Sequence, residues 1–243
     1  MVGGNQRRFL NVWSVMALIL HIETATEVCS AALSRDGELI ALCETNDATS
    51  HSAVLTLHIE QCLERAGVDL AAIDAVSVSS GPGSYTSLRV GASVAKGICY
   101  ALRKPLVVVD TLQSLAWACG QHKAVENEVF CPMIDARRME VYAALFDAEA
   151  NRLCANEAKI ISADFWDEWG ADFAKIGFSG SGAPKCEEVL KNSKAVFYQV
   201  VCSAAHHVFL ANRAFVEKKF IDAAYFVPDY GKAPNITVSA KIL

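Results

Sequence analysis

Two acidic residues, Glu23 and Asp135, are the side chains best placed for catalysis, because each ends a short run of strand-forming residues. Carboxylates at two strand ends could face each other across a cleft and work as a general acid and a general base. The alternative is that each carboxylate is solvated and caps N–H groups of the turn that follows it. We favour the second interpretation, in which neither residue is catalytic.

A second candidate is the segment Ser79–Gly97, SSGPGSYTSLRVGASVAKG, which predicts a strand end, a Gly-Pro-Gly turn and a helix of small residues. Glycine-rich turns before helices often bind phosphate, since a helix N-terminus presents free N–H groups. A P-loop would need Gly-Lys-Ser/Thr where Ser84, Tyr85 and Thr86 stand. We therefore favour a structural turn, and infer that the small residues of the helix allow close approach of another backbone.

The histidines and the remaining glycine-rich turn give weaker signals. His51 and His58 lie seven residues apart. His206 and His207 are adjacent and point to different sides of a helix, so they cannot share one metal site easily. The turn Gly180-Ser181-Gly182 could border an adenine pocket, although a plain turn is the favoured interpretation.

Composition limits the classes of function. The chain has 243 residues, of which 53% are hydrophobic, and a mean hydropathy of +0.25, which is ample for a sizeable core. Its net charge is −5, whereas a protein that grips nucleic acid alone usually has a basic surplus. Nine cysteines, scattered without a CxxC pair, predict reduced thiols that pack as small hydrophobic groups in a cytoplasmic protein.

The N-terminal residues superficially resemble a signal peptide, because Arg7 and Arg8 precede an apolar run. The run lacks a small-residue cleavage site directly after it, and polar residues interrupt it. We interpret Met16 as the functional start and residues 1–15 as a disordered leader or a start-site artefact. No segment reaches the roughly 18 uninterrupted apolar residues of a membrane span, so we expect none.

The order of the predicted elements indicates an α/β protein with mixed sheets flanked by helices. Strands are predicted at 17–23, 28–34, 38–44, 75–79 and 106–109. Helices are predicted at 52–66, 87–102 and 111–119, and near 185–192 and 204–219.

The second half of the sequence repeats the opening. The segment Ile134–Leu145 aligns on Ile22–Leu33, although strand hydrophobic residues could produce part of this match by chance. The alternative is a duplicated subdomain, with an N-terminal copy at 16–123 and a smaller C-terminal copy at 124–243 that ends in an irregular tail.

The helices at 52–66 and 87–102 are more apolar than a single buried face requires. The second helix has one apolar stripe at Leu88, Ala92, Ala95, Cys99 and Leu102, and another at Val90, Val94, Gly97 and Ala101. A helix that is apolar nearly all round is buried on two sides. The second side could be covered within this chain or by another chain.

Four segments resemble those of the TsaB (YeaZ) family: Ile22–Thr26, Ser79–Gly97, Ile134–Tyr142 and Gly180–Gly182. The resemblance spans about residues 16–230 and implies the actin/Hsp70/sugar-kinase-like fold, with two related subdomains. The chain departs from the family at Glu23, Ser87 and Met139, where Asp, Gly and Gly are more usual. After Tyr230 the match is poor.

The resemblance implies a scaffold and activator that is not itself an enzyme. Its partner would be TsaD, which transfers threonylcarbamoyl to the adenosine beside the anticodon of tRNAs reading codons that begin with A. In the family, the two helices pack against the matching pair of TsaD, or of a second copy, as a four-helix bundle. The residues expected at that interface are Val54, Leu57, His58, Gln61, Val90, Ser93, Val94, Gly97 and Ala101.

The same resemblance sets expectations for other partners and for bound groups. A TsaE-like ATPase and tRNA would associate only through the complex, and the chain alone could form a homodimer. TsaD has two metal-binding histidines at the positions of Thr111 and Leu115, so no metal and no cofactor are expected here. The alternative function is an independent ATP-dependent small-molecule kinase, or a metalloprotease-like enzyme, of the same fold.

Overall fold

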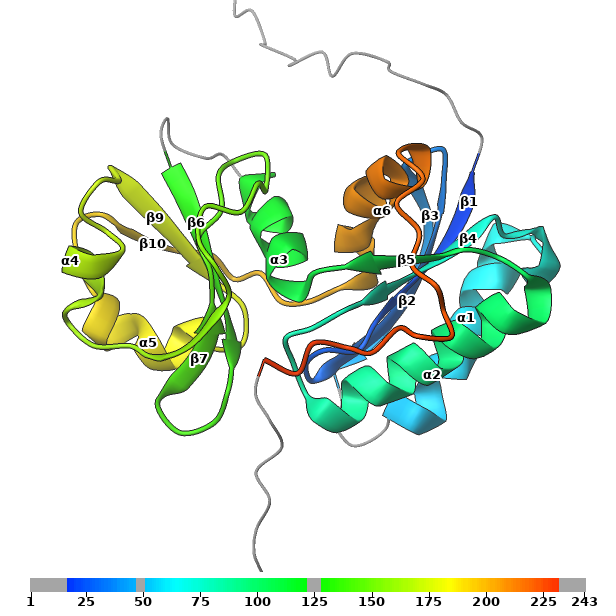
Figure 1. Cartoon of the computed structure of the whole chain (residues 1–243), viewed down its shortest axis with the longest axis horizontal. Helices are drawn as coiled ribbons and strands as arrows, with labels where there is room; N and C mark the ends of the chain where they lie inside the picture. Colours follow the sequence, from blue (N-terminus) through cyan, green and yellow to red (C-terminus); the bar gives the residue numbers. More distant parts are fainter. Residues whose placement is uncertain (1–16, 47–50, 122–127, 232–243) are drawn as a thin grey trace, which may run out of the picture.

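The computed structural model describes residues 17–46, 51–121 and 128–231, which form two five-stranded sheets beside each other (Figure 1). The first sheet has the strand order β3-β2-β1-β4-β5. Its strands are β1 (Leu18–Glu23), β2 (Val28–Arg35), β3 (Glu38–Asn46), β4 (Ala75–Ser79) and β5 (Leu106–Val109). The β1-β2 and β2-β3 pairs are antiparallel, whereas β4 and β5 run parallel to β1, so the sheet is mixed as predicted.

The second sheet repeats the arrangement of the first. Its strands are β6 (Glu128–Asp135), β7 (Glu140–Ala143), β8 (Glu157–Ile160), β9 (Lys175–Ser179) and β10 (Ala195–Phe197). Their order is β10-β9-β6-β7-β8, so the first strand is again central, between the second and the fourth. Glu23 and Asp135 end the first strand of their respective sheets. The predicted duplication is therefore confirmed, and the protein has the actin/Hsp70/sugar-kinase-like fold.

Helices cover both faces of the first sheet. The helices of the described residues are α1 (His51–Ala66), α2 (Tyr85–Leu102), α3 (Thr111–Gly120), α4 (Phe165–Glu168), α5 (Ala183–Leu190) and α6 (His207–Val216), with the short 3-10 helices η1 (Leu70–Ala72) and η2 (Ala204–His206). α1 and α2 pack on the face that includes Leu20 and Ile22, whereas α6 packs on the face that includes Val107 and Val109. In the described part of the chain, no helix has the length and apolar character needed to cross a bilayer.

Two helices connect the sheets. α3 follows β5 of the first sheet but packs on β6 and β9 of the second (Figure 1). α6 follows the second sheet in the sequence but packs on β5, β1 and β4 of the first. The division into 16–123 and 124–243 stays a prediction, because its boundary lies within residues 122–127, outside the described residues. Residues 1–15 and 232–243 also lie outside them.

Element boundaries follow from local signals. The Ser84 side chain accepts a hydrogen bond from the Ser87 N–H, so α2 begins at Tyr85, two residues earlier than predicted. α1 ends before Gly67, whose φ of 63° is the left-handed conformation predicted for a helix C-terminus.

The cysteines pack as predicted. All nine are free thiols, and all except Cys154 are buried. Burial raises the pKa of Cys29 and of Cys99 to about 11, so these thiols are neutral at physiological pH. They act as small hydrophobic side chains rather than as nucleophiles.

A chain of buried polar side chains runs through the first sheet to α6. The two ring nitrogens of His21 lie 2.7 Å from Ser77 Oγ and 2.7 Å from Ser34 Oγ. Ser77 Oγ lies 3.4 Å from Nδ1 of His207, whose Nε2 lies 3.1 Å from Oε2 of Glu23. All five residues are fully buried, so their polar groups depend on one another for hydrogen bonds.

We predict that His21 makes the protein less stable as the pH falls below 6.5. Burial, and secondarily the nearby His207, hold the pKa of folded His21 well below 6.5, so the unfolded chain binds this proton first. The stability from neutral His21 is complete above pH 6.5 and is lost as the pH falls towards the folded pKa. His21→Gln should flatten the decline in unfolding free energy as the pH falls below 6.5, measured by denaturant titration. Equal slopes in both proteins would contradict the prediction.

Candidate functional site

The Gly-Pro-Gly turn between β4 and α2 packs against two other segments of the chain. A Cβ atom on Gly81 would lie 1.9 Å from the carbonyl oxygen of Asp229, and one on Gly83 would lie 2.3 Å from that of Ala25. Asp229 also donates its N–H to the carbonyl of Ser80 at 2.7 Å. The chain's own backbone thus makes the close approach that these glycines allow, which supports a structural turn over a phosphate site.

The segment 222–231 runs along α2 towards this turn (red in Figure 1). Lys96 of α2 donates hydrogen bonds to the carbonyls of Ala224 at 3.2 Å and Phe226 at 3.1 Å. The Phe226 ring is buried in the core of the first subdomain. The residues after Tyr225 were predicted only as an irregular tail, although the apolar run 223–227 could have indicated that they pack on α2.

Glu23 is buried, which corrects the expectation of a solvated strand end. Its Oε2 pairs with Nε2 of His207 at 3.1 Å, and its Oε1 accepts the N–H of Ala25 at 2.6 Å. Burial alone would raise the pKa of this carboxyl, but the hydrogen bond and charge of His207 outweigh it and hold the pKa below its usual value. Glu23 therefore caps its turn as predicted, but it has no surface that a substrate could reach.

Asp135 occupies the equivalent position in the second sheet, but its side chain is 49% exposed. It accepts the N–H of Arg137 at 2.7 Å and pairs with Nζ of Lys185. An acid/base pair needs both carboxyls at one accessible point. The burial of Glu23 therefore favours the capping interpretation.

Thr111 and Leu115, which stand where the related catalytic family has metal-binding histidines, lie in α3 and face the interior. Thr111 and Leu115 are both fully buried, and Leu115 belongs to the core of the second subdomain. Within the described residues, no three His, Cys, Asp or Glu side chains gather as a metal site. The absence of a bound metal stays a prediction.

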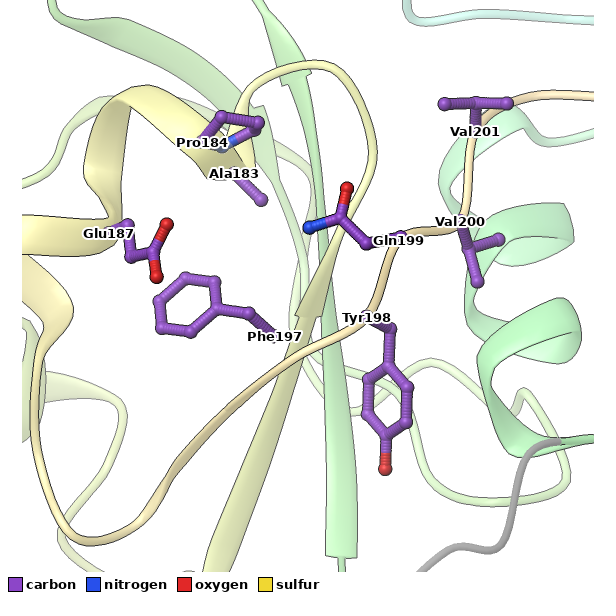
Figure 2. Close-up of a pocket in the computed structure, with 8 residues that line it drawn as sticks. All are labelled: Ala183, Pro184, Glu187, Phe197, Tyr198, Gln199, Val200 and Val201. Atoms are coloured by element: carbon purple, nitrogen blue, oxygen red, sulfur yellow. The ribbon is translucent and has the colours of Figure 1, made fainter.

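The turn Gly180-Ser181-Gly182 packs against the end of β6. A Cβ atom on Gly180 would lie 2.4 Å from the carbonyl oxygen of Met133, and Gly182 donates its N–H to the same oxygen at 2.9 Å. Figure 2 shows the pocket next to this turn, between α5 and the segment that includes Phe197 and Gln199. Its volume is about 50 Å³, room for a few water molecules rather than for adenine, which supports a plain turn.

α2 buries one of its two apolar stripes and leaves the other partly open. The buried members of the first stripe are Leu88, Ala92, Ala95 and Cys99. On the other side, Ser93, Gly97 and Ala101 are exposed, whereas Val90 and Val94 are half-buried against the core. The chain's own core thus covers the second stripe only in part, and the exposed part is available to another chain.

α1 carries the other four residues expected at the interface. Of its four expected interface residues, Leu57 and Gln61 are exposed, Leu57 to 51%. Val54 and His58 are half-buried, and burial lowers the pKa of His58, which is therefore neutral at pH 7. The nine expected residues, called the α1–α2 surface below, thus range from half-buried to exposed. Their contact with another chain stays a prediction.

Comparisons with known proteins point to one family. The family model described as TsaD, tRNA N6-adenosine threonylcarbamoyltransferase, matches residues 45–240. The tRNA threonylcarbamoyladenosine biosynthesis protein TsaB of Haemophilus influenzae is 36% identical over 124 residues, which cover 51% of each chain. The protein of the same name from Bacillus subtilis is 26% identical over 216 residues, covering 87% of this chain and 93% of that one. The chain therefore spans about half the length of the first relative and nearly all of the second.

A solved structure agrees with these matches. YeaZ from Pseudomonas aeruginosa superposes with a TM-score of 0.78 at 26% identity, covering 88% of this chain and 100% of that one. The two proteins therefore share a fold over most of the described residues.

We predict that two glycines of α2 respond in opposite ways to substitution by alanine. A Cβ atom on Gly91 would lie 2.4 Å from Thr24 Oγ1, whereas no described atom lies within 4 Å of one on Gly97. Gly91→Ala should lower the free energy of unfolding by about 1–3 kcal/mol through overpacking. Gly97→Ala should raise it by up to about 1 kcal/mol through helix propensity. Denaturant unfolding checks both, and a large loss at Gly97 would mean that this position faces the core.

Proposed function

We propose that this chain, which belongs to the TsaD family and within it to the TsaB (YeaZ) proteins, is a non-catalytic subunit in tRNA threonylcarbamoyladenosine synthesis. It binds and organises a TsaD-like catalytic subunit. That subunit transfers threonylcarbamoyl to the adenosine next to the anticodon of tRNAs that read codons beginning with A. A TsaE-like ATPase and tRNA associate with the chain through this complex, in the cytoplasm. In isolation the chain pairs with a second copy.

The observation that carries the proposal is that the α1–α2 surface presents small and apolar side chains to solvent. Glu23, by contrast, is buried and paired with His207. Exposed apolar side chains that lie together on neighbouring helices are typical of a protein interface. The small side chains at Ser93, Gly97 and Ala101 would let a partner helix approach α2 closely, because interaxial distance depends on side-chain size at the contact.

The alternative, an independent ATP-dependent kinase or metalloprotease-like enzyme, has less support. Phosphates need backbone that they can approach, and the spaces beside Gly81 and Gly83 are occupied by Asp229 and Ala25. Steady ATP turnover by the lone protein would favour the alternative, and we expect almost none.

Two substitutions on the α1–α2 surface should weaken binding without unfolding the protein. Leu57→Glu places a charge in the contact, and Gly97→Leu fills the space that a partner helix would use. Each should raise the Kd for the TsaD-like subunit by at least about tenfold. Calorimetric titration measures the effect, and the thermal midpoint should stay near that of the parent, because both positions are exposed.

Val189→Glu on α5 is the matched control, since Val189 is an apolar helical residue that is 37% exposed and lies in the other subdomain. It should bind as the parent does. Normal binding by both α1–α2 variants, or a large fall in their melting temperature, would refute the proposed interface.

Asp135→Ala should leave tRNA modification by the reconstituted complex within about threefold of the parent, since this carboxylate only caps a turn and pairs with Lys185. A loss of about a thousandfold with the complex intact would show that Asp135 is catalytic. Glu23→Ala is a poorer test. It would leave His207 buried without its partner, at a cost of about 3–5 kcal/mol of stability.

A further inference from the structure

A groove of about 670 Å³ separates the C-terminal half of α1, with the segment that follows it, from α2. Its apolar lining is Ile59, Leu63, Val68, Leu70, Val94 and Ile98. Three of its other residues are acidic, namely Glu60, Glu64 and Asp69, and none of its lining residues is basic. Val94 also belongs to the α1–α2 surface, so the groove continues that surface towards the C-terminal ends of both helices.

The acidic residues of the groove have no counter-ion within the described residues. Glu60 and Glu64 are exposed, lie one turn apart on α1 and take part in none of the ion pairs there. Asp69 accepts the N–H of Ala71 at 2.8 Å. Arg65, next to Glu64 in sequence, donates instead to the carbonyl of Leu42 on β3. Like charges four residues apart on a helix repel, and a cation supplied from outside would relieve that repulsion.

We propose that this groove binds a basic amphipathic helix of the TsaD-like subunit. Its apolar side chains would lie on the groove floor, and its Lys or Arg side chains would pair with Glu60 and Glu64. The inference rests on the proposed function and names the chemistry of the partner's contact. A second copy of this chain fits the groove less well, because a chain with a net charge of −5 offers fewer basic than acidic side chains to pair with Glu60 and Glu64.

The test is a double charge reversal, Glu60→Lys with Glu64→Lys, compared with Glu187→Lys with Glu188→Lys. The control acids are also exposed and helical, but they are consecutive residues of α5 in the other subdomain. The Kd for the TsaD-like subunit is measured at about 0.1 M and about 1 M salt, where the screening length falls from about 10 Å to about 3 Å. The groove variant should bind at least about tenfold more weakly at low salt and less so at high salt, and the control should bind as the parent does.

A second substitution tests the apolar part of the groove. Thr56 is exposed and lines the groove, so Thr56→Trp fills it without changing charge. We expect a loss of affinity that is the same at both salt concentrations. If the charge-reversed protein does not fold, the neutral pair Glu60→Gln with Glu64→Gln should still show a weaker dependence of Kd on salt.

The outcomes separate this inference from the proposed function. If Gly97→Leu weakens binding but the groove variants bind as the parent does, the groove proposal is wrong and the α1–α2 interface stands. If none of them weakens binding, both are wrong. If the groove variants change only the self-association of the lone chain in sedimentation experiments, the occupant is a second copy and the proposal is overturned.

Discussion

The buried pair of Glu23 and His207 links the two ends of the fold. Glu23 ends β1 and His207 begins α6, 184 residues away in the sequence. Removing either partner would leave the other side chain buried without its ionic partner, which costs about 3–5 kcal/mol in such pairs. The Glu23 carboxylate also accepts a hydrogen bond from the N–H of Ala25. The carbonyl of Ala25 in turn accepts the N–H of Ser84 at 2.7 Å. The start of α2 is therefore positioned, through two hydrogen bonds, by one carboxylate.

This constraint bears directly on function. In a fold of two related halves, a carboxylate at the end of the first strand is the obvious candidate for a catalytic group. Here that carboxylate, Glu23, is buried in the interior. The equivalent Asp135 stays at the surface, paired with Lys185. The duplicated halves have thus diverged, and the segment 222–231 packs across the turn where a phosphate would otherwise be sought.

α2 shows how one helix serves two purposes through its small residues. Gly91 lets α2 approach the side chain of Thr24, so its lack of a side chain is required by the internal packing. Gly97, less than two turns later, faces open space among the described residues. Glycine therefore allows close packing within the chain on one side of α2, and on the other side it leaves space that another chain could use.

Much of the fold was determined by local sequence, because strands, turns and helix ends depend on neighbouring residues. The strands at 75–79 and 106–109 were predicted to the residue, and Gly67 was identified as a helix end. The internal repeat predicted the duplicated sheet. The apolar stripes of α2 were also predicted from the spacing of its residues, since each residue of a helix adds the same angle of rotation.

Only the tertiary structure decided which of these features are covered. No local signal indicates that Glu23 is buried, because its partner His207 comes from the far end of the sequence. The same holds for α3 and α6, each of which packs on the sheet of the other half. Val54 and Leu57 both looked available on α1, yet one is half-buried and the other exposed. Helical spacing shows which residues share a side of the helix, but the neighbours that cover that side come from distant segments.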